Sequence, residues 1–154
     1  MAYRLIEAHL DALASQLKDN MASKVAELNV DYGDTLLVNI TRWYLGGLPL
    51  EMPEIPCIAI NPVSFELLEE WQGEGILGKS HFNIVIVVGD VDAERRFRML
   101  TRYGRAVLEL IQVWTTPYTK LYEGAWGWSE VMIAEPYLQG VAIPVQLIKA
   151  EDKI

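Results

Sequence analysis

The stretch FNIVIVVGDVDAERRFRML, residues 82–100, decides the fold, because an alternating apolar segment changes into a helical pattern within it. Apolar side chains occupy both faces of the extended part: Phe82, Ile84, Ile86 and Val88 lie on one face, Val85 and Val87 on the other. Two apolar faces are typical of the middle of a sheet, so residues 76–88 are predicted to form a central strand. Asp92 is the expected N-cap of a helix over about 92–113.

The junction at Gly89 raises the question of a nucleotide site, because a strand that turns through glycine into a helix can bind phosphate. Phosphate-binding loops use several glycines, or a glycine-rich loop with a lysine and a hydroxyl residue. This junction has one glycine, and Asp90 and Asp92 would repel an anion at the helix N-terminus. It is therefore predicted to be a strand-to-helix turn with an aspartate cap.

An amphipathic helix is predicted at the N-terminal end of the chain. Apolar residues recur there at spacings of three and four: Tyr3, Ile6, Leu10, Leu13 and Leu17, continued by Met21, Val25 and Leu28. The polar segment NVDYGD, residues 29–34, ends the pattern. Two helices separated near Asp19 and Asn20 are the alternative.

Further strands are predicted from β-branched and aromatic composition. They cover residues 35–44, a segment from Cys57 interrupted at Pro62, and residues 126–134 and 139–149, with an acidic turn at 66–75. Pro144 lacks a backbone donor, so the last strand is predicted to be an edge strand or to contain a bulge. Residues 1–154 are thus predicted to form a single α+β domain, whose mainly antiparallel or mixed sheet of about four to five strands packs against both helices.

Composition excludes several classes of protein. With 13 basic and 21 acidic residues the formal charge is −8, which disfavours binding to nucleic acid or anionic lipid. One cysteine, Cys57, and two distant histidines, His9 and His81, give no basis for a disulfide or a zinc site. The N-terminal sequence MAYRLIEAHL has no apolar core, so the chain is expected not to be exported. We predict no cofactor, no metal site and no catalytic residues.

An acidic cluster is the strongest candidate for ligand chemistry. Glu66, Glu69, Glu70 and Glu74 surround Trp71, and paired carboxylates beside an aromatic ring could hydrolyse glycosides or hold a divalent cation. A solvated turn is the alternative. His81, flanked by apolar residues, is expected to be structural.

Two groups of residues in the predicted helices and strands are candidates for contacts with another subunit or partner. The predicted second helix carries Arg95, Arg98, Arg102 and Arg105. These arginines could bind phosphates, pair with acids of a neighbouring subunit, or pair with Glu94 and Glu109 of the same helix, and the acidic composition favours a subunit contact over DNA. Trp126 and Trp128 share one face of a predicted strand, where they could pack in the core, pack in an interface, or stack on a sugar or a base.

The segment 45–56, LGGLPLEMPEIP, contains two glycines and three prolines and is predicted to be an extended loop. Its apolar residues Leu48, Leu50, Met52 and Ile55 suit a contact arm that becomes ordered on assembly.

The order of these segments resembles that of the tail-terminator and neck (head-to-tail completion) proteins of tailed bacteriophages. The likeness covers most of the chain: the N-terminal helix, the proline-rich loop, PCIAINP before the acidic turn, the strand GKSHFNIVIVVGD, the helix DAERRFRMLTRYGRAVLELI and two closing strands. Members of that family form hexameric rings that cap the tail tube or join it to the head, and they have no catalytic residues.

The resemblance implies a non-enzymatic virion protein, made in the host cytoplasm, that assembles with itself, with the tail-tube protein and with head-tail connector proteins. DNA would pass through an acidic channel of such a ring without specific binding. Two alternatives stay open: a small-ligand or metal-binding domain or enzyme that uses the Glu66–Glu74 cluster, and a bacterial interaction domain unrelated to phage.

Overall fold

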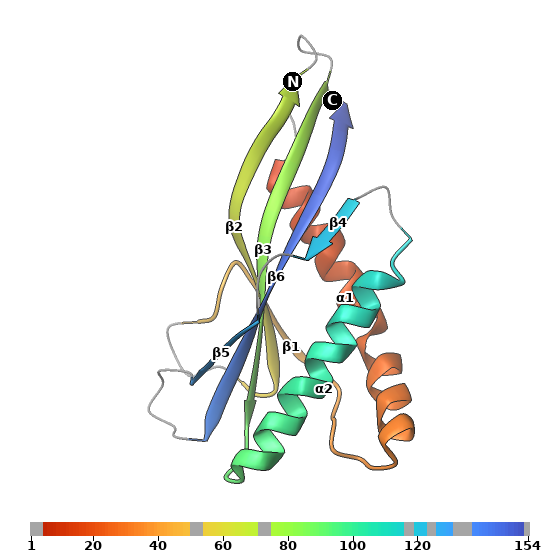
Figure 1. Cartoon of the computed structure of the whole chain (residues 1–154), viewed down its shortest axis with the longest axis vertical. Helices are drawn as coiled ribbons and strands as arrows, with labels where there is room; N and C mark the ends of the chain where they lie inside the picture. The colour runs from red at the N-terminus through yellow and green to blue at the C-terminus, as the bar shows by residue number, and fades with distance from the viewer. Residues whose placement is uncertain are drawn as a thin grey trace.

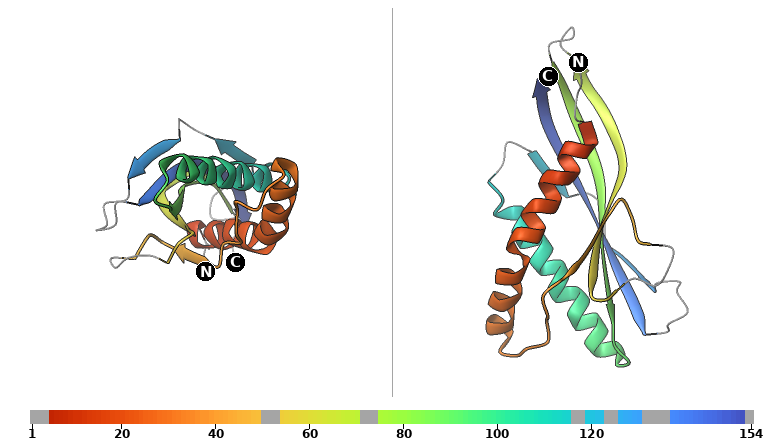
Figure 2. Two further views of the ribbon diagram at one scale, coloured as in Figure 1. Left: turned by 90° about the horizontal axis from the view of Figure 1, so that it is seen from below. Right: turned by 180° about the vertical axis from the view of Figure 1, so that it is seen from behind.

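The computed structural model describes residues 5–49, 54–70, 75–115, 119–122, 126–130 and 137–152. Two helices, α1 (Leu5–Tyr32) and α2 (Ala93–Gln112), pack against each other and against a twisted sheet (Figure 1). The strands are β1 (Arg42–Leu45), β2 (Cys57–Glu70), β3 (Gly75–Gly89), β4 (Thr119–Tyr122), β5 (Gly127–Glu130) and β6 (Leu138–Asp152). The long strands β2, β3 and β6 extend beyond both helices at one end (Figure 2). The predicted α+β class is confirmed.

The sheet is mixed and mostly antiparallel, with the order β1-β2-β3-β6-β4. Strands β4 and β5 pair with residues 145–148 and 139–142 of β6, on the side away from β3, so they share one position in the sheet. Six strands therefore occupy five positions. Among the described strands only β1 and β2 are parallel, which requires the chain to cross back between Leu45 and Cys57.

The stretch that decides the fold behaves as predicted. Strand β3 lies between β2 and β6, and Phe82, Ile84, Ile86 and Val88 are buried beneath the helices. The carboxylate of Asp92 caps α2 by accepting a hydrogen bond from the backbone N–H of Glu94 at 2.9 Å. Strand, turn and helix are thus specified locally, by side-chain alternation and by one cap.

Helix α1 is continuous from Leu5 to Tyr32, so the alternative of two separate helices is wrong. Its narrow apolar seam is buried in the core: Leu13, Leu17, Met21, Val25 and Leu28 are at most 5% exposed. Among the described residues no helix is long and apolar enough to cross a bilayer.

The prediction of a strand over 35–44 is wrong for residues 35–41, which have no regular structure. Leu37 and Ile40 are buried, but side chains rather than a neighbouring strand bind the backbone. The amide of Asn29 bonds both backbone groups of Leu37, at 3.1 and 2.9 Å. The hydroxyl of Tyr103 does the same for Val38, accepting from its N–H at 3.1 Å and donating to its carbonyl at 2.7 Å. Because side chains satisfy the backbone groups of Leu37 and Val38, this part of the segment does not need to pair with a strand.

The acidic turn predicted at 66–75 is wrong for residues 66–70, which continue β2, and for Gly75, where β3 begins, while residues 71–74 lie outside the described residues. The strand passes Pro62 without ending, because register shifts at Pro62/Ser64 and Leu67/Glu69 accommodate extra residues against β3. Such shifts bend a strand but do not terminate its pairing.

Strand β6 is not an edge strand, which corrects the prediction made from Pro144. It pairs with β3 along its length and, on its other side, with β5 up to Ala142 and with β4 from Val145. Pro144 lies opposite Asn83 of β3 and, on the other side of β6, between the residues that pair with the two short strands. Strand β4 was not predicted, because four residues carry too little alternation to be recognised.

Candidate functional site

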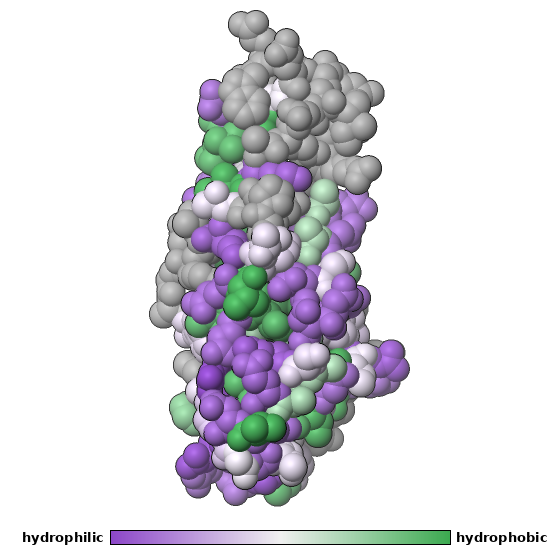
Figure 3. All heavy atoms as spheres, turned by 90° about the vertical axis from the view of Figure 1, so that its right-hand side faces the viewer, coloured by the Kyte–Doolittle hydropathy of each residue, from purple (hydrophilic) through white to green (hydrophobic). Residues whose placement is uncertain are grey.

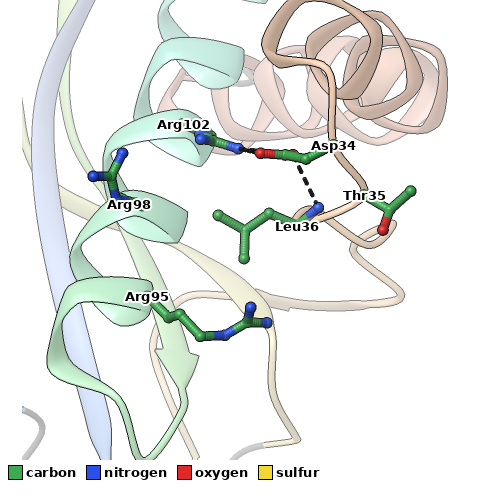
Figure 4. Close-up of a pocket in the computed structure, with 6 residues that line it drawn as sticks. All are labelled: Asp34, Thr35, Leu36, Arg95, Arg98 and Arg102. Atoms are coloured by element: carbon green, nitrogen blue, oxygen red, sulfur yellow. Dashed lines mark hydrogen bonds and ion pairs between the residues drawn. The ribbon is translucent and has the colours of Figure 1, made fainter.

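The arginine face of α2 borders a hollow of about 390 Å³ on the surface of the protein. Its lining comes from two elements: Asp34, Thr35 and Leu36 from the segment after α1, and Arg95, Arg98 and Arg102 from α2. Figure 4 shows Arg102 directed at Asp34 and Arg95 extending below Leu36. The sequence predicts the arginine face but not the segment that faces it, which lies about 60 residues earlier in the chain.

Arg102 holds this segment against α2. Its Nη1 donates to both carboxylate oxygens of Asp34, at 2.9 and 2.7 Å, and its guanidinium lies 4.0 Å from the centre of the Tyr32 ring. The hydrogen bond from Arg102 lowers the pKa of Asp34 below its usual range. The Arg102 side chain is only 10% exposed, so its contacts are within the protein.

Arg105 also connects the two helices. It donates to Asp31 at 2.7 Å and to Glu109 at 3.1 Å, and Glu109 in turn binds Lys24 of α1 at 2.9 Å. The hydrogen bond from Lys24 is the main cause that lowers the pKa of Glu109. The pairing of Arg105 with Glu109, and of Arg98 with Glu94, confirms the helix pairs expected from four-residue spacing.

Arg95 and Arg98 differ from these two because they lie at the rim, with side chains 55% and 57% exposed. Arg95 donates through Nε to Asp90 at 3.1 Å, and Arg98 donates through Nε and Nη2 to Glu94. Within the described part of the chain, both terminal nitrogens of Arg95 and Nη1 of Arg98 make no hydrogen bond. A guanidinium binds carboxylates through such nitrogens, so this end of α2 can bind an acidic group.

A second hollow of about 410 Å³ continues the first along α2. It is lined by Tyr32, Glu94, Phe97, Arg98, Thr101 and Arg102, and thus shares two arginines with the first. Phe97, in this second hollow, is 53% exposed. We call the two hollows together the α2 groove. On this side of the molecule hydrophilic side chains surround small apolar areas (Figure 3).

Trp126 packs against the core, as one of the three interpretations of the tryptophan pair expects. A Cβ added to Gly104 of α2 would lie 2.4 Å from Cζ3 of Trp126, so the glycine permits this close approach. The helix position occupied by Gly104 is thus explained by a ring from a distant segment. Trp128 is in β5, but its side chain lies outside the described residues.

The proline-rich loop is described only at its two ends, so Leu50 and Met52 lie outside the described residues. Leu48 is half-buried, and a Cβ at Gly89 would meet Cδ1 of Ile55, which therefore covers the end of β3. Glu54 forms an ion pair with Arg42, and its N–H donates to the hydroxyl of Tyr44. These contacts attach the second end of the loop to the protein's own β1 and β3.

The acidic cluster makes contacts across the sheet. Glu66 lies 3.2 Å from His81 and 3.9 Å from Lys79, both on β3. The Glu70 side chain, Trp71 and Glu74 lie outside the described residues. No group of three metal-ligating side chains occurs among the described residues. His81 was expected to be structural, and it forms a cross-strand ion pair when protonated.

One polar pair escaped prediction because its members are 71 residues apart. Nδ1 of His9 lies 2.5 Å from Oγ of Ser80, beneath α1, and the two residues are 2% and 0% exposed. A nucleophilic serine must reach its substrate, and Ser80 cannot. The pair satisfies two buried polar groups.

No model of a known protein family matches the sequence, and comparison with curated proteins finds no similar sequence.

Proposed function

We propose that the protein is a non-enzymatic structural protein of a tailed bacteriophage, which forms a homo-oligomeric ring at the head-tail junction or at the head-proximal end of the tail tube. The observation that carries the proposal is the α2 groove. There Arg95 and Arg98 combine unused hydrogen-bond donors with the exposed ring of Phe97. Arginine and aromatic residues at one site are typical of protein interfaces.

Three further observations support the proposal. The N-terminal helix, the central strand, the helix after it and the closing strand follow one another in the order on which the resemblance to tail-terminator and neck proteins rests. The polar pair that most resembles a catalytic dyad, His9 and Ser80, is buried. The net charge of −8 suits a ring through which DNA passes without binding.

The partners in this proposal are other copies of the chain, the tail-tube protein and connector proteins, and the assembled location is the virion. Mass in solution and electron microscopy test it. We expect a particle of about six times the 17.4 kDa chain mass, seen as a ring that binds the end of tail tubes. A monomer that forms no ring and binds neither tubes nor connectors at high concentration would refute the proposal.

A further inference from the structure

A hollow of about 170 Å³ lies on the face of the sheet opposite the helices. Phe82 of β3 and Val145 of β6 belong to the core beneath the helices. Because side chains alternate along a strand, the residues on either side of each of these two point to the opposite face. On that face the hollow is lined by His81, Asn83, Pro144 and Gln146.

The pairing of the strands fixes the positions of these side chains. His81 lies opposite Gln146, and Asn83 lies opposite Pro144, in the ladder between β3 and β6. Val63 of β2 also lines the hollow and is 59% exposed. It is the extra residue at the first register shift of β2, and such a bulge changes the direction of a side chain. The hollow thus combines two apolar side chains with three polar ones.

Gln146 is the polar residue that calls for a partner. It is 2% exposed, and its Oε1 has no hydrogen-bond partner in the part of the chain that the structure describes. Buried amide groups are almost always hydrogen-bonded, because an unpaired one has given up its bonds to water without replacement. The hollow beside Gln146 is where a molecule that supplies the missing donor can enter.

The size and charge of the hollow define the group that fits it. Since one molecule of liquid water takes about 30 Å³, the hollow has room for about five heavy atoms. Sites for larger ligands measure about 300 Å³ or more, so a nucleotide does not fit. The nearby charged residues pair with one another: Glu66 lies 3.2 Å from His81 and 3.9 Å from Lys79. An uncharged group therefore suits the hollow better than an ion does.

We infer that this hollow binds a small uncharged ligand with a primary amide group, whose N–H donates to Oε1 of Gln146. A primary amide also has a carbonyl oxygen beside its N–H, which can accept a hydrogen bond from the amide nitrogen of Gln146 or of Asn83. The carbon chain of the ligand contacts Val63 and Pro144. The inference does not depend on the proposed ring, because none of these residues lines the α2 groove.

Propionamide, an uncharged primary amide of this size, is the probe that tests the inference. Saturation-transfer NMR measures its binding to the whole protein, whether the protein is monomeric or assembled. Propionate and propylammonium have a similar size and carry a charge, so they are compared with it. We expect propionamide to bind at least about tenfold more tightly than either ion, because an ion would lose its hydration and find no unpaired charge of opposite sign in the hollow.

Two variants change the hollow in different ways. Gln146→Met keeps the size of the side chain and removes its polar atoms, and Val63→Phe fills the hollow from the exposed bulge. Each should weaken the binding of propionamide at least about tenfold. Gln112→Met makes the first change at an exposed position of α2, and this control should bind propionamide as the wild type does. Because Val63 is exposed, Val63→Phe keeps the test decisive if Gln146→Met does not fold.

Three results would overturn the inference. The first is equal binding of propionamide by the wild type and Val63→Phe, and the second is equal binding of the three probes by the wild type. The third is a wild type that binds no propionamide, which would show that the hollow holds water only. Each of these results leaves the proposed ring untouched, because the ring is tested by mass and electron microscopy.

Discussion

The hydroxyl of Tyr103 is predicted to be one of the largest single contributions to stability outside the apolar core. The residue is fully buried in α2, and its hydroxyl is the partner of both backbone groups of Val38. Tyr103→Phe keeps the ring and removes both hydrogen bonds. Each net bond contributes about 1 kcal/mol, so the variant should lose about 2 kcal/mol of unfolding free energy.

Tyr44→Phe is a matched control. Its hydroxyl also accepts from a loop N–H, that of Glu54 at 3.2 Å, but this is one hydrogen bond at the exposed surface, whereas the Tyr103 side chain is fully buried and makes two. We expect this variant to lose less than about 0.5 kcal/mol. Urea unfolding at one fixed protein concentration measures both variants, because self-association adds to apparent stability.

Hydrogen exchange distinguishes the proposed cause from a general weakening. If Tyr103 holds the segment 35–41, the N–H of Val38 should exchange faster in Tyr103→Phe, while the N–H groups of β3 change only by the global loss of stability. Equal stability losses in Tyr103→Phe and Tyr44→Phe, or unchanged exchange at Val38, would show that the hydroxyl does not hold this segment.

Three further changes have expected outcomes. Gly104→Ala should destabilise the protein by about 1–3 kcal/mol in urea unfolding, because the added Cβ would clash with Trp126. When Gly104→Ala is combined with Trp126→Ala, the loss of stability should be smaller than the sum of the two single losses. Basic partners lower the pKa values of Asp34 and Glu109 in the folded protein. The stability that these carboxylates contribute is therefore complete above their pKa in the unfolded chain, about 4, and should be lost as the pH falls through their lower pKa values in the folded protein. A urea midpoint of unfolding that does not change below pH 4 would contradict this. Burial raises the pKa of Cys57 to about 11, so a thiol reagent at pH 8 should label it only after unfolding, and rapid labelling of the native protein would contradict its burial.

The parts of the fold that sequence predicts correctly are those specified by neighbouring residues. Strand β3 follows from alternation of apolar side chains, and the start of α2 follows from one aspartate before a helical pattern. Helix α1 follows from a seam of apolar residues at three- and four-residue spacing. In each case the spacing of apolar residues equals the side-chain period of a strand or a helix, so a short stretch of sequence is enough to predict the element.

The failures occur where distant residues decide the structure. Residues 35–41 have the composition of a strand, yet Asn29 and Tyr103 supply their backbone partners. Pro144 predicts an edge, yet it occupies the interval between β4 and β5 on the same side of β6. Composition cannot show which partner a backbone group will find, because that depends on segments far apart in the sequence.

The candidate site shows the same division. Four-residue spacing on α2 predicts the arginine face and its pairs with Glu94 and Glu109, both of which the structure contains. The spacing does not show which arginines remain available to bind another molecule. Arg102 and Arg105 pair with Asp34 and Asp31, which belong to the segment after α1 and to the end of α1, far from α2 in the sequence. Only the packing of the two helices distinguishes Arg102, which is buried, from Arg98, which is exposed.

This distinction decides how the site must be tested. Reversing Arg98 together with Arg102 would remove the ion pair that holds Asp34 against α2, and it would leave a buried carboxylate in its place. Lost assembly in that variant would then show only that the groove had lost its shape. Arg95 and Arg98 make their ion pairs with Asp90 and Glu94, near the start of α2 and on its surface, so their reversal leaves the contact between the helices intact. Assembly that is lost when Arg95 and Arg98 are reversed, while urea unfolding stays as in the wild type, is therefore the result that separates binding at the groove from the stability of the groove itself.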